Sequence, residues 1–175
     1  MSPDTSTSVR IAVTGAGLIG KRHVKVVGRR STAVISAIVD PDPAAQELAD
    51  ENGCKWYCSI TELLSADAPD GVIIATPNQM HVENGLECVR LGVPILVEKP
   101  ISGDVRSASR LVDEAGWSDV PVLVGHHRRH NPPVHAARRQ IENSAIGDIV
   151  AVHVSCWFYK PDDYFKVDWR TRPIP

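Results

Sequence analysis

Short apolar runs and helix-length segments alternate through the first 125 residues, and this alternation constrains the fold more than any other feature. Runs rich in β-branched residues predict buried strands at 9–14, 33–39, 71–76, 93–98 and 120–125. Helical segments separate most of these strands, as the crossover connections of a parallel sheet require. The pattern therefore predicts a doubly wound α/β domain with a parallel sheet over residues 9–125.

The segments between the strands predict four helices. The first covers residues 18–30, and the second covers residues 41–53, where Gly53 ends it. Apolar stripes on the other two should face the sheet: Val82, Leu86 and Val89 on the third, and Ala108, Leu111, Val112 and Ala115 on the fourth.

The pattern changes after Gly125. Pro132 predicts the start of a helix that runs to about Asn143. Residues 149–159 then alternate strictly, with apolar side chains on one face and mixed side chains on the other, which predicts an antiparallel strand with one buried face. A single strand is not stable alone. We therefore expect residues 126–175 to be a linker helix and the first strand of a truncated C-terminal α+β domain with an antiparallel sheet.

Composition limits the partners that such a protein can have. The formal net charge of −2 gives no electrostatic reason to expect nucleic acid or an anionic membrane as a partner. Residues 1–8 are polar and lack the apolar stretch of a secretory signal, so they read as a disordered leader. Scattered cysteines indicate reduced thiols and a cytoplasmic protein: Cys54, Cys58, Cys88 and Cys156.

Gly15, Gly17 and Gly20 lie on the turn between the first strand and the first helix. At this spacing the first glycine permits the tight turn, the second lets the backbone approach a pyrophosphate, and the third lets helix and strand pack closely. Asp40, at the end of the second strand, could accept from ribose hydroxyls and repel a 2′-phosphate, which favours NAD over NADP. Two alternatives remain open: the glycines could form only a tight turn, and Asp40 could only cap the helix after Pro41.

Polar side chains follow the strand at 71–76. Thr76 and Asn78 lie at the strand's carboxyl end, where ligands bind in parallel sheets, and Pro77 stiffens the turn. His81 could join them or could be a surface residue in the first turn of the next helix.

Lys99 follows the next strand, between Glu98 and Pro100. A lysine in this place can hydrogen-bond a substrate hydroxyl and take or give its proton. The alternative is a surface ion pair between Lys99 and Glu98.

A metal site is not expected. His126 and His130 have a spacing that could hold zinc on a helix, but Pro132 and Pro133 argue against a helix upstream of them. The nearby sequence offers no cysteine or acid to complete such a site.

The segments GAGLIGKRH, ATPNQMH, GVPILVEKP, VGHHRRHNP and GDIVAVHVSCWFYKP…WR resemble the Gfo/Idh/MocA oxidoreductases over residues 9–172. The resemblance implies an NAD(P)-binding Rossmann domain and hydride transfer at an alcohol carbon of a sugar, cyclitol or similar small molecule. It implies that Lys99 is the catalytic lysine. Residues implied to line the dinucleotide are Gly15, Gly17, Leu18, Ile19, Gly20, Asp40, Thr76, Asn78, His81 and Glu98. Residues implied to face nicotinamide or substrate are His127, Arg128, Trp169 and Arg170, together with Lys99.

The sequence departs from the family in its length. Family members continue into a C-terminal domain that shapes the substrate pocket, often forms the oligomer interface, and carries an Asp-x-x-x-His pair that completes proton transfer. We therefore expect a homo-oligomer formed through that domain. A non-catalytic NAD-binding or redox-sensing module, or an inactive fragment, remains the alternative.

Overall fold

The computed structural model of the chain describes residues 8–166. The chain divides between Gly125 and His126 into two compact units, and each is described by itself. The polar leader, apart from its last residue, and the predicted site residues Trp169 and Arg170 lie outside the described residues.

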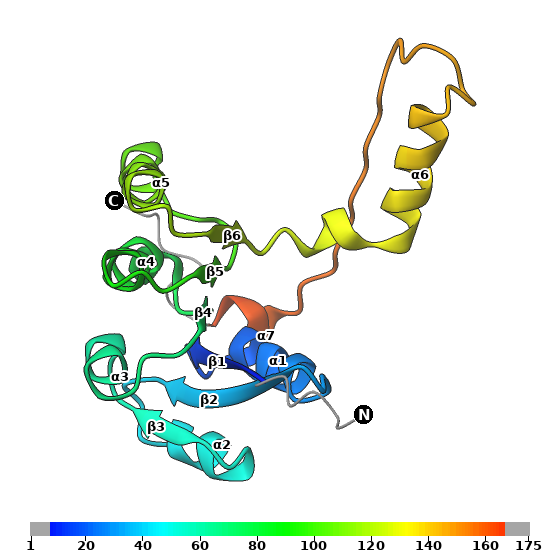
Figure 1. Cartoon of the computed structure of the whole chain (residues 1–175). Helices are drawn as coiled ribbons and strands as arrows, with labels where there is room; N and C mark the ends of the chain where they lie inside the picture. Colours follow the sequence, from blue (N-terminus) through cyan, green and yellow to red (C-terminus); the bar gives the residue numbers. More distant parts are fainter. Residues whose placement is uncertain (1–7, 167–175) are drawn as a thin grey trace, which may run out of the picture. The chain divides into compact units, whose positions relative to one another are not determined.

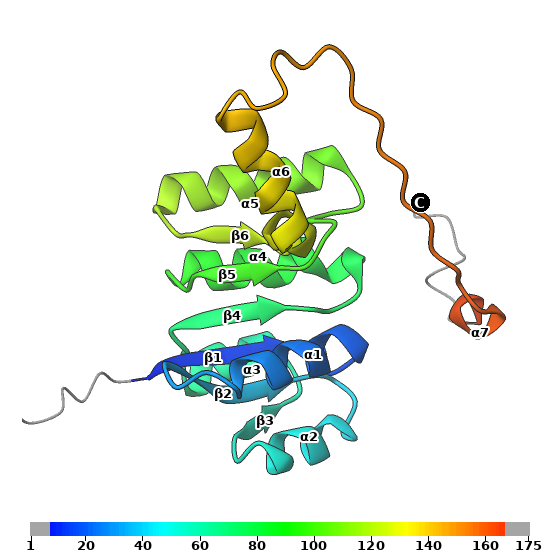
Figure 2. The ribbon, with the colours of Figure 1, turned by 90° about the vertical axis from the view of Figure 1, so that its right-hand side faces the viewer.

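The first unit contains a six-stranded sheet in the order β3-β2-β1-β4-β5-β6, and every neighbouring pair is parallel. Figure 2 shows the six arrows pointing the same way. The strands are β1 (Val9–Thr14), β2 (Ala33–Val39), β3 (Lys55–Tyr57), β4 (Gly71–Ile74), β5 (Ile95–Val97) and β6 (Val122–Val124).

Helices cover both faces of the sheet (Figure 1). On one face lie α1 (Leu18–Val27) and α2 (Ala45–Glu51). On the other lie α3 (Ile60–Ala66), α4 (His81–Arg90) and α5 (Val105–Ser118), and a short 3-10 turn, η1 (Asn78–Met80), precedes α4. The predicted doubly wound parallel fold is therefore confirmed for this unit.

Successive residues of a strand contribute to two separate cores, because side chains in a strand alternate between faces. Val13 and Ile38 are fully buried in the core beneath α1 and α2. Ala12, Val39 and Ile74 are buried in the core beneath α3, α4 and α5. Each valine or isoleucine side chain buried in this way contributes about 1.5–3 kcal/mol.

The predicted apolar stripes face the sheet with one exception. Val82, Leu86 and Val89 on α4 are buried, as are Leu111 and Ala115 on α5. Val112 is 55% exposed instead. The reason is that α5 lies beside β6, the edge strand, and no further strand covers the outer part of its stripe.

The sequence did not predict β3 and α3. The strand is only three residues long and includes a lysine, so it gives no apolar run. A signal for α3 was present in Ser59 and Glu62, which have the spacing of a capping box. The Ser59 hydroxyl accepts from the Glu62 N–H, and the Glu62 carboxylate accepts from the N–H of Cys58.

The second unit contains η2 (His127–His130), α6 (Pro132–Glu142) and α7 (Asp162–Phe165). The helix predicted from Pro132 is present. Residues 149–160 form no strand here, and Val150 and Trp157 are more than 90% exposed, so the strand expected at 149–159 stays a prediction. The physical reason is that the described part of this unit offers no second strand, so the alternating segment has nothing to pair with. An antiparallel sheet is thus absent from residues 126–166.

The four cysteines are unpaired and differ in reactivity, which can be tested. Burial of Cys88 in α4 raises the pKa of its thiol to about 12, whereas Cys156 is exposed. Because the thiolate is the reactive form, a maleimide near neutral pH should label Cys156 first and Cys88 only after unfolding. Cys58 should react slowly despite its exposure, because its hydrogen bond to Glu62 raises its pKa. Mass spectrometry of the labelled peptides gives the order, and early labelling of Cys88 would contradict the packing of α4.

Candidate functional site

The predicted functional residues of the first unit gather at one edge of the sheet. The carboxyl ends of its parallel strands all lie at this edge, where Figure 2 shows the arrowheads. The glycine loop follows β1, Asp40 follows β2, Thr76 follows β4 and Lys99 follows β5. The topology thus brings together residues that are far apart in the sequence.

Two glycines of the loop are required by the chain itself. Gly15 has a φ of +93°, and a Cβ atom on it would lie 2.6 Å from the backbone of Ala75. A Cβ atom on Gly20 would lie 1.7 Å from the carbonyl oxygen of Gly15. A larger residue at either position would force the backbone apart.

Gly17 is different. Its φ of −70° suits any residue, and beyond its chain neighbours and its own helix no atom of the described part of the chain lies within 4 Å of where its Cβ would be. This open position is the N-cap of α1, and the first N–H groups of a helix have no partner within it. Such a helix start attracts anions. Leu18 and Ile19, the next residues, are exposed. A tight turn explains Gly15 and Gly20, whereas neither backbone conformation nor packing within the described chain requires a glycine at position 17.

Asp40 joins the glycine loop to the turn after β2. One carboxylate oxygen accepts from the N–H of Ala16 at 2.7 Å, and the other accepts from the N–H of Asp42 at 2.9 Å. The alternative that Asp40 only caps the next helix does not hold, because Ala44 is the N-cap of α2.

A cavity of about 410 Å³ lies beside this carboxylate. Its lining includes four acidic side chains and one lysine: Asp40, Asp42, Glu47, Glu51 and Lys21. These acidic groups give the cavity a negative electrostatic potential, which disfavours the binding of a phosphate group beside Asp40.

His81 is neither at the surface nor available to a ligand. It begins α4 and is only 1% exposed. Its Nε2 lies 2.9 Å from the carbonyl oxygen of Thr76, and its Nδ1 lies 2.8 Å from that of Pro100. The predicted contact between this side chain and a dinucleotide therefore has no polar atom left to make it. Asn78, predicted to line the same site, is half-buried at the start of η1.

Glu98 pairs with a residue that the sequence analysis did not single out. Its Oε1 lies 2.9 Å from Nε2 of His23 on α1, and both side chains are less than a quarter exposed. Lys99 is exposed and forms no ion pair within residues 8–166. The alternative of a Lys99–Glu98 surface pair is therefore wrong. The sequence offered one signal for His23. It lies three residues after Gly20, which places it on the same face of the helix as the glycine loop.

The remaining predicted residues belong to the second unit. His127 and Arg128 lie in η2, and the guanidinium carbon of Arg128 lies 4.7 Å from the centre of the Phe158 ring.

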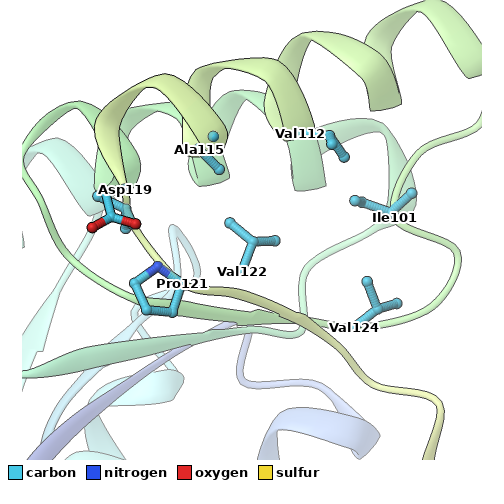
Figure 3. Close-up of a pocket in the computed structure, with 9 residues that line it drawn as sticks. Ile101, Val112, Ala115, Asp119, Pro121, Val122 and Val124 are labelled. Atoms are coloured by element: carbon cyan, nitrogen blue, oxygen red, sulfur yellow. The ribbon is translucent and has the colours of Figure 1, made fainter.

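A second cavity, of about 370 Å³, lies between α5 and β6 (Figure 3). Val112, Val122, Val124 and Ile101 make its lining mainly apolar, and Asp119 is its one ionisable group. It lacks the convergent polar groups of the edge that carries Asp40 and Lys99.

No three histidine, cysteine or acidic side chains among residues 8–166 cluster so that they could hold a metal ion. In the same range, no helix has the length and apolar character needed to cross a membrane.

Comparison with known proteins agrees with this geometry. The sequence profile of an oxidoreductase family with an NAD-binding Rossmann fold, Gfo/Idh/MocA, matches residues 9–126. Inositol 2-dehydrogenase from Corynebacterium glutamicum (strain R) is 37% identical over 149 residues, which are 83% of this chain and 44% of that protein. The rhizopine catabolism protein MocA from Rhizobium meliloti is 32% identical over 155 residues, 89% of this chain and 49% of that protein.

The crystal structure of the WlbA dehydrogenase from Bordetella pertussis, in complex with NADH and UDP-GlcNAcA, has a TM-score of 0.87 and 25% identity. The match covers 93% of this chain and 51% of that one. The chain thus spans about half the length of the relatives it matches. Because the family profile covers more than half of its residues, the chain belongs to the Gfo/Idh/MocA family of oxidoreductases.

Proposed function

We propose that this chain is the cofactor-binding part of an NAD-dependent dehydrogenase that acts on an alcohol carbon of a sugar, cyclitol or related small molecule. The observation that carries the proposal is the open position at Gly17, beside the acidic cavity at Asp40. The relatives support the reaction class, because one is an inositol 2-dehydrogenase and WlbA is a dehydrogenase seen with NADH.

The residues present fit a dinucleotide. A pyrophosphate has room at Gly17 and can accept from the first N–H groups of α1, those of Leu18 and Ile19 included. Asp40 keeps lone pairs for ribose hydroxyls, because each of its oxygens accepts only one backbone hydrogen bond. Thr76, Asn78 and Glu98 line the part of the site that leads toward the nicotinamide end of the dinucleotide. When bound, the nicotinamide supplies the acceptor or donor of the hydride.

Lys99 handles the proton. Its amine is exposed at the carboxyl end of β5 and has no acidic partner within residues 8–166. It holds the substrate hydroxyl and takes the hydroxyl proton as the carbon loses its hydride, so that a carbonyl forms; the reverse reaction returns the proton. His127, Arg128, Trp169 and Arg170 contribute to the substrate side.

The second unit belongs to the same proposal. Residues 126–175 begin the domain that binds substrate and forms a homo-oligomer, and no nucleic acid or membrane is involved. A cytoplasmic location agrees with four unpaired cysteines.

Cofactor preference gives the direct test. We expect isothermal titration to show tighter binding of NADH than of NADPH, because a 2′-phosphate would lie among the carboxylates of Asp40, Asp42 and Glu47. Asp40→Ser should reduce the ratio of the two affinities by about tenfold, or about 1.4 kcal/mol.

Asp113→Ser is the matched control, because Asp113 is exposed on α5, away from the cavity. It should leave the ratio unchanged. A native preference for NADPH would contradict the role of Asp40. Binding of neither cofactor would mean that the chain is an inert fragment. Binding of NADH without turnover of polyols by the full-length protein would favour a redox-sensing module.

A further inference from the structure

Two histidines from different helices hold the residues on either side of Lys99. His23, on α1, contacts the Glu98 carboxylate, and His81, on α4, contacts the carbonyl oxygen of Pro100. Lys99 itself is exposed. We call His23 and His81 the histidine bracket.

His81 ties the ends of two neighbouring strands together. Its ring reaches the carbonyl oxygen of Thr76 after β4 and that of Pro100 after β5, at 2.9 and 2.8 Å. Carbonyl oxygens only accept, so each contact is a hydrogen bond when the ring nitrogen facing it carries a proton. A neutral imidazole has one N–H and donates to one of the two carbonyls at a time, whereas the protonated ring donates to both. At 1% exposure, the ring is also held in place by its surroundings.

His23 acts on the other side of Lys99 through Glu98. The Glu98 carboxylate meets His23 at 2.9 Å and accepts from the N–H of Lys99 at 3.3 Å. It also lies against Gly125, where a Cβ atom would be 3.0 Å from Oε1. Glu98 is therefore fixed by α1, by the end of β6 and by the lysine's own backbone.

We propose that His23 and His81 are positioning residues that fix the backbone on both sides of Lys99 and so present its amine at one place above β4 and β5. This inference rests on the proposed function, since it is proton transfer by Lys99 that needs such placement. Displacement of a reacting group by about 1 Å can cost roughly a hundredfold in rate. Neither histidine needs to touch substrate or cofactor for this role.

The 175-residue chain allows a first test without any activity. Amide hydrogen exchange is followed by NMR in His81→Phe, which keeps a buried ring but loses both contacts, and in His23→Gln, at a partly exposed site where folding should survive. We expect two amides to exchange about tenfold faster in each variant, as for the loss of one hydrogen bond: that of Lys99, which donates to the Glu98 carboxylate, and that of Glu98, which donates to the carbonyl oxygen of Ile74.

Gly85→Ala is the control on the same helix as His81. Its Cβ atom would press on Leu111 at 2.9 Å and on Ile95 at 3.2 Å, so it disturbs the packing of α4 against α5 and β5 and leaves the side chains of His23 and His81 in place. Exchange at Lys99 and Glu98 should not change in this variant. If both variants fold and the exchange rates of these two amides stay at their wild-type values, the bracket does not position Lys99.

Turnover of a polyol by the full-length protein separates this inference from the proposed function. Each histidine variant should lower kcat by roughly ten- to a hundredfold and leave the KM for NAD nearly unchanged. The double variant His81→Phe/Lys99→Ala should be no slower than Lys99→Ala alone. Both changes remove the same contribution to the rate, proton transfer by a correctly placed Lys99 amine. If Lys99→Ala lowers kcat and the histidine variants do not, the bracket is wrong. If Lys99→Ala itself has no effect, the proposed role of Lys99 is wrong.

Discussion

Replacing Gly17 with valine is expected to abolish NADH binding and to leave the first unit folded. Nothing in the described chain occupies the space of the new side chain, and a φ of −70° suits valine. The valine would instead fill the position where we propose that a pyrophosphate reaches the start of α1. We expect the affinity to fall at least about a hundredfold, or about 2.7 kcal/mol, in isothermal titration. The melting temperature should change little.

Gly20→Ala is the contrasting variant. Its Cβ atom would lie 1.7 Å from the carbonyl oxygen of Gly15, so the loop cannot close around it. This variant should fail to fold or should melt at a much lower temperature. Wild-type NADH affinity in Gly17→Val would show that the whole motif is only a turn, and the proposed function would lose the observation that carries it.

Lys99→Ala in the full-length protein should lower kcat by about 10²–10⁴, the usual contribution of a general acid or base. The side chain is exposed and forms no ion pair within residues 8–166, so stability should not change. The dissociation constant for NADH should also stay nearly constant, because the role proposed for the lysine is at the substrate hydroxyl. Stopped-flow absorbance of NADH gives the rate, and fluorescence titration gives the affinity.

Two further lysine variants make this result specific. Lys25→Ala removes an exposed lysine from the last turn of α1 and should leave kcat unchanged. Lys99→Arg keeps the positive charge but cannot exchange a proton easily, so it should be nearly as slow as Lys99→Ala. Full turnover in Lys99→Ala would exclude this residue from the chemistry.

The sequence predicted the fold where the local signal was strong. The bounds of β1 and β2 agree with the prediction, because each is a mainly apolar run that is followed by a glycine or an aspartate. It missed β3, whose three residues belong to the sheet only because β2 pairs with them. It placed a strand at 149–159, because alternation predicts which side chains would share a face but not whether a partner strand is present.

The candidate site could be predicted only in part for a similar reason. The motif spacing indicated what each glycine could do, but coordinates were needed to separate Gly17 from the two glycines that the chain itself requires. The pairing of His23 with Glu98 joins residues 75 positions apart, and no local pattern encodes such a contact. Burial of His81 likewise depends on Thr76 and Pro100, which come from two different loops.

The contact between Gly15 and the backbone at Ala75 and Thr76 matters for anyone who engineers the cofactor preference of this protein. The glycine loop cannot be exchanged alone, because its backbone packs closely against a loop some 60 residues away along the chain. A loop grafted from another dinucleotide-binding protein must therefore bring its own counterpart of residues 75–76. The counterpart of His81 must come as well, since Thr76 is tied through that ring to Pro100. Grafts of residues 15–20 alone should yield poorly folded protein, whereas grafts of both loops should yield soluble chains.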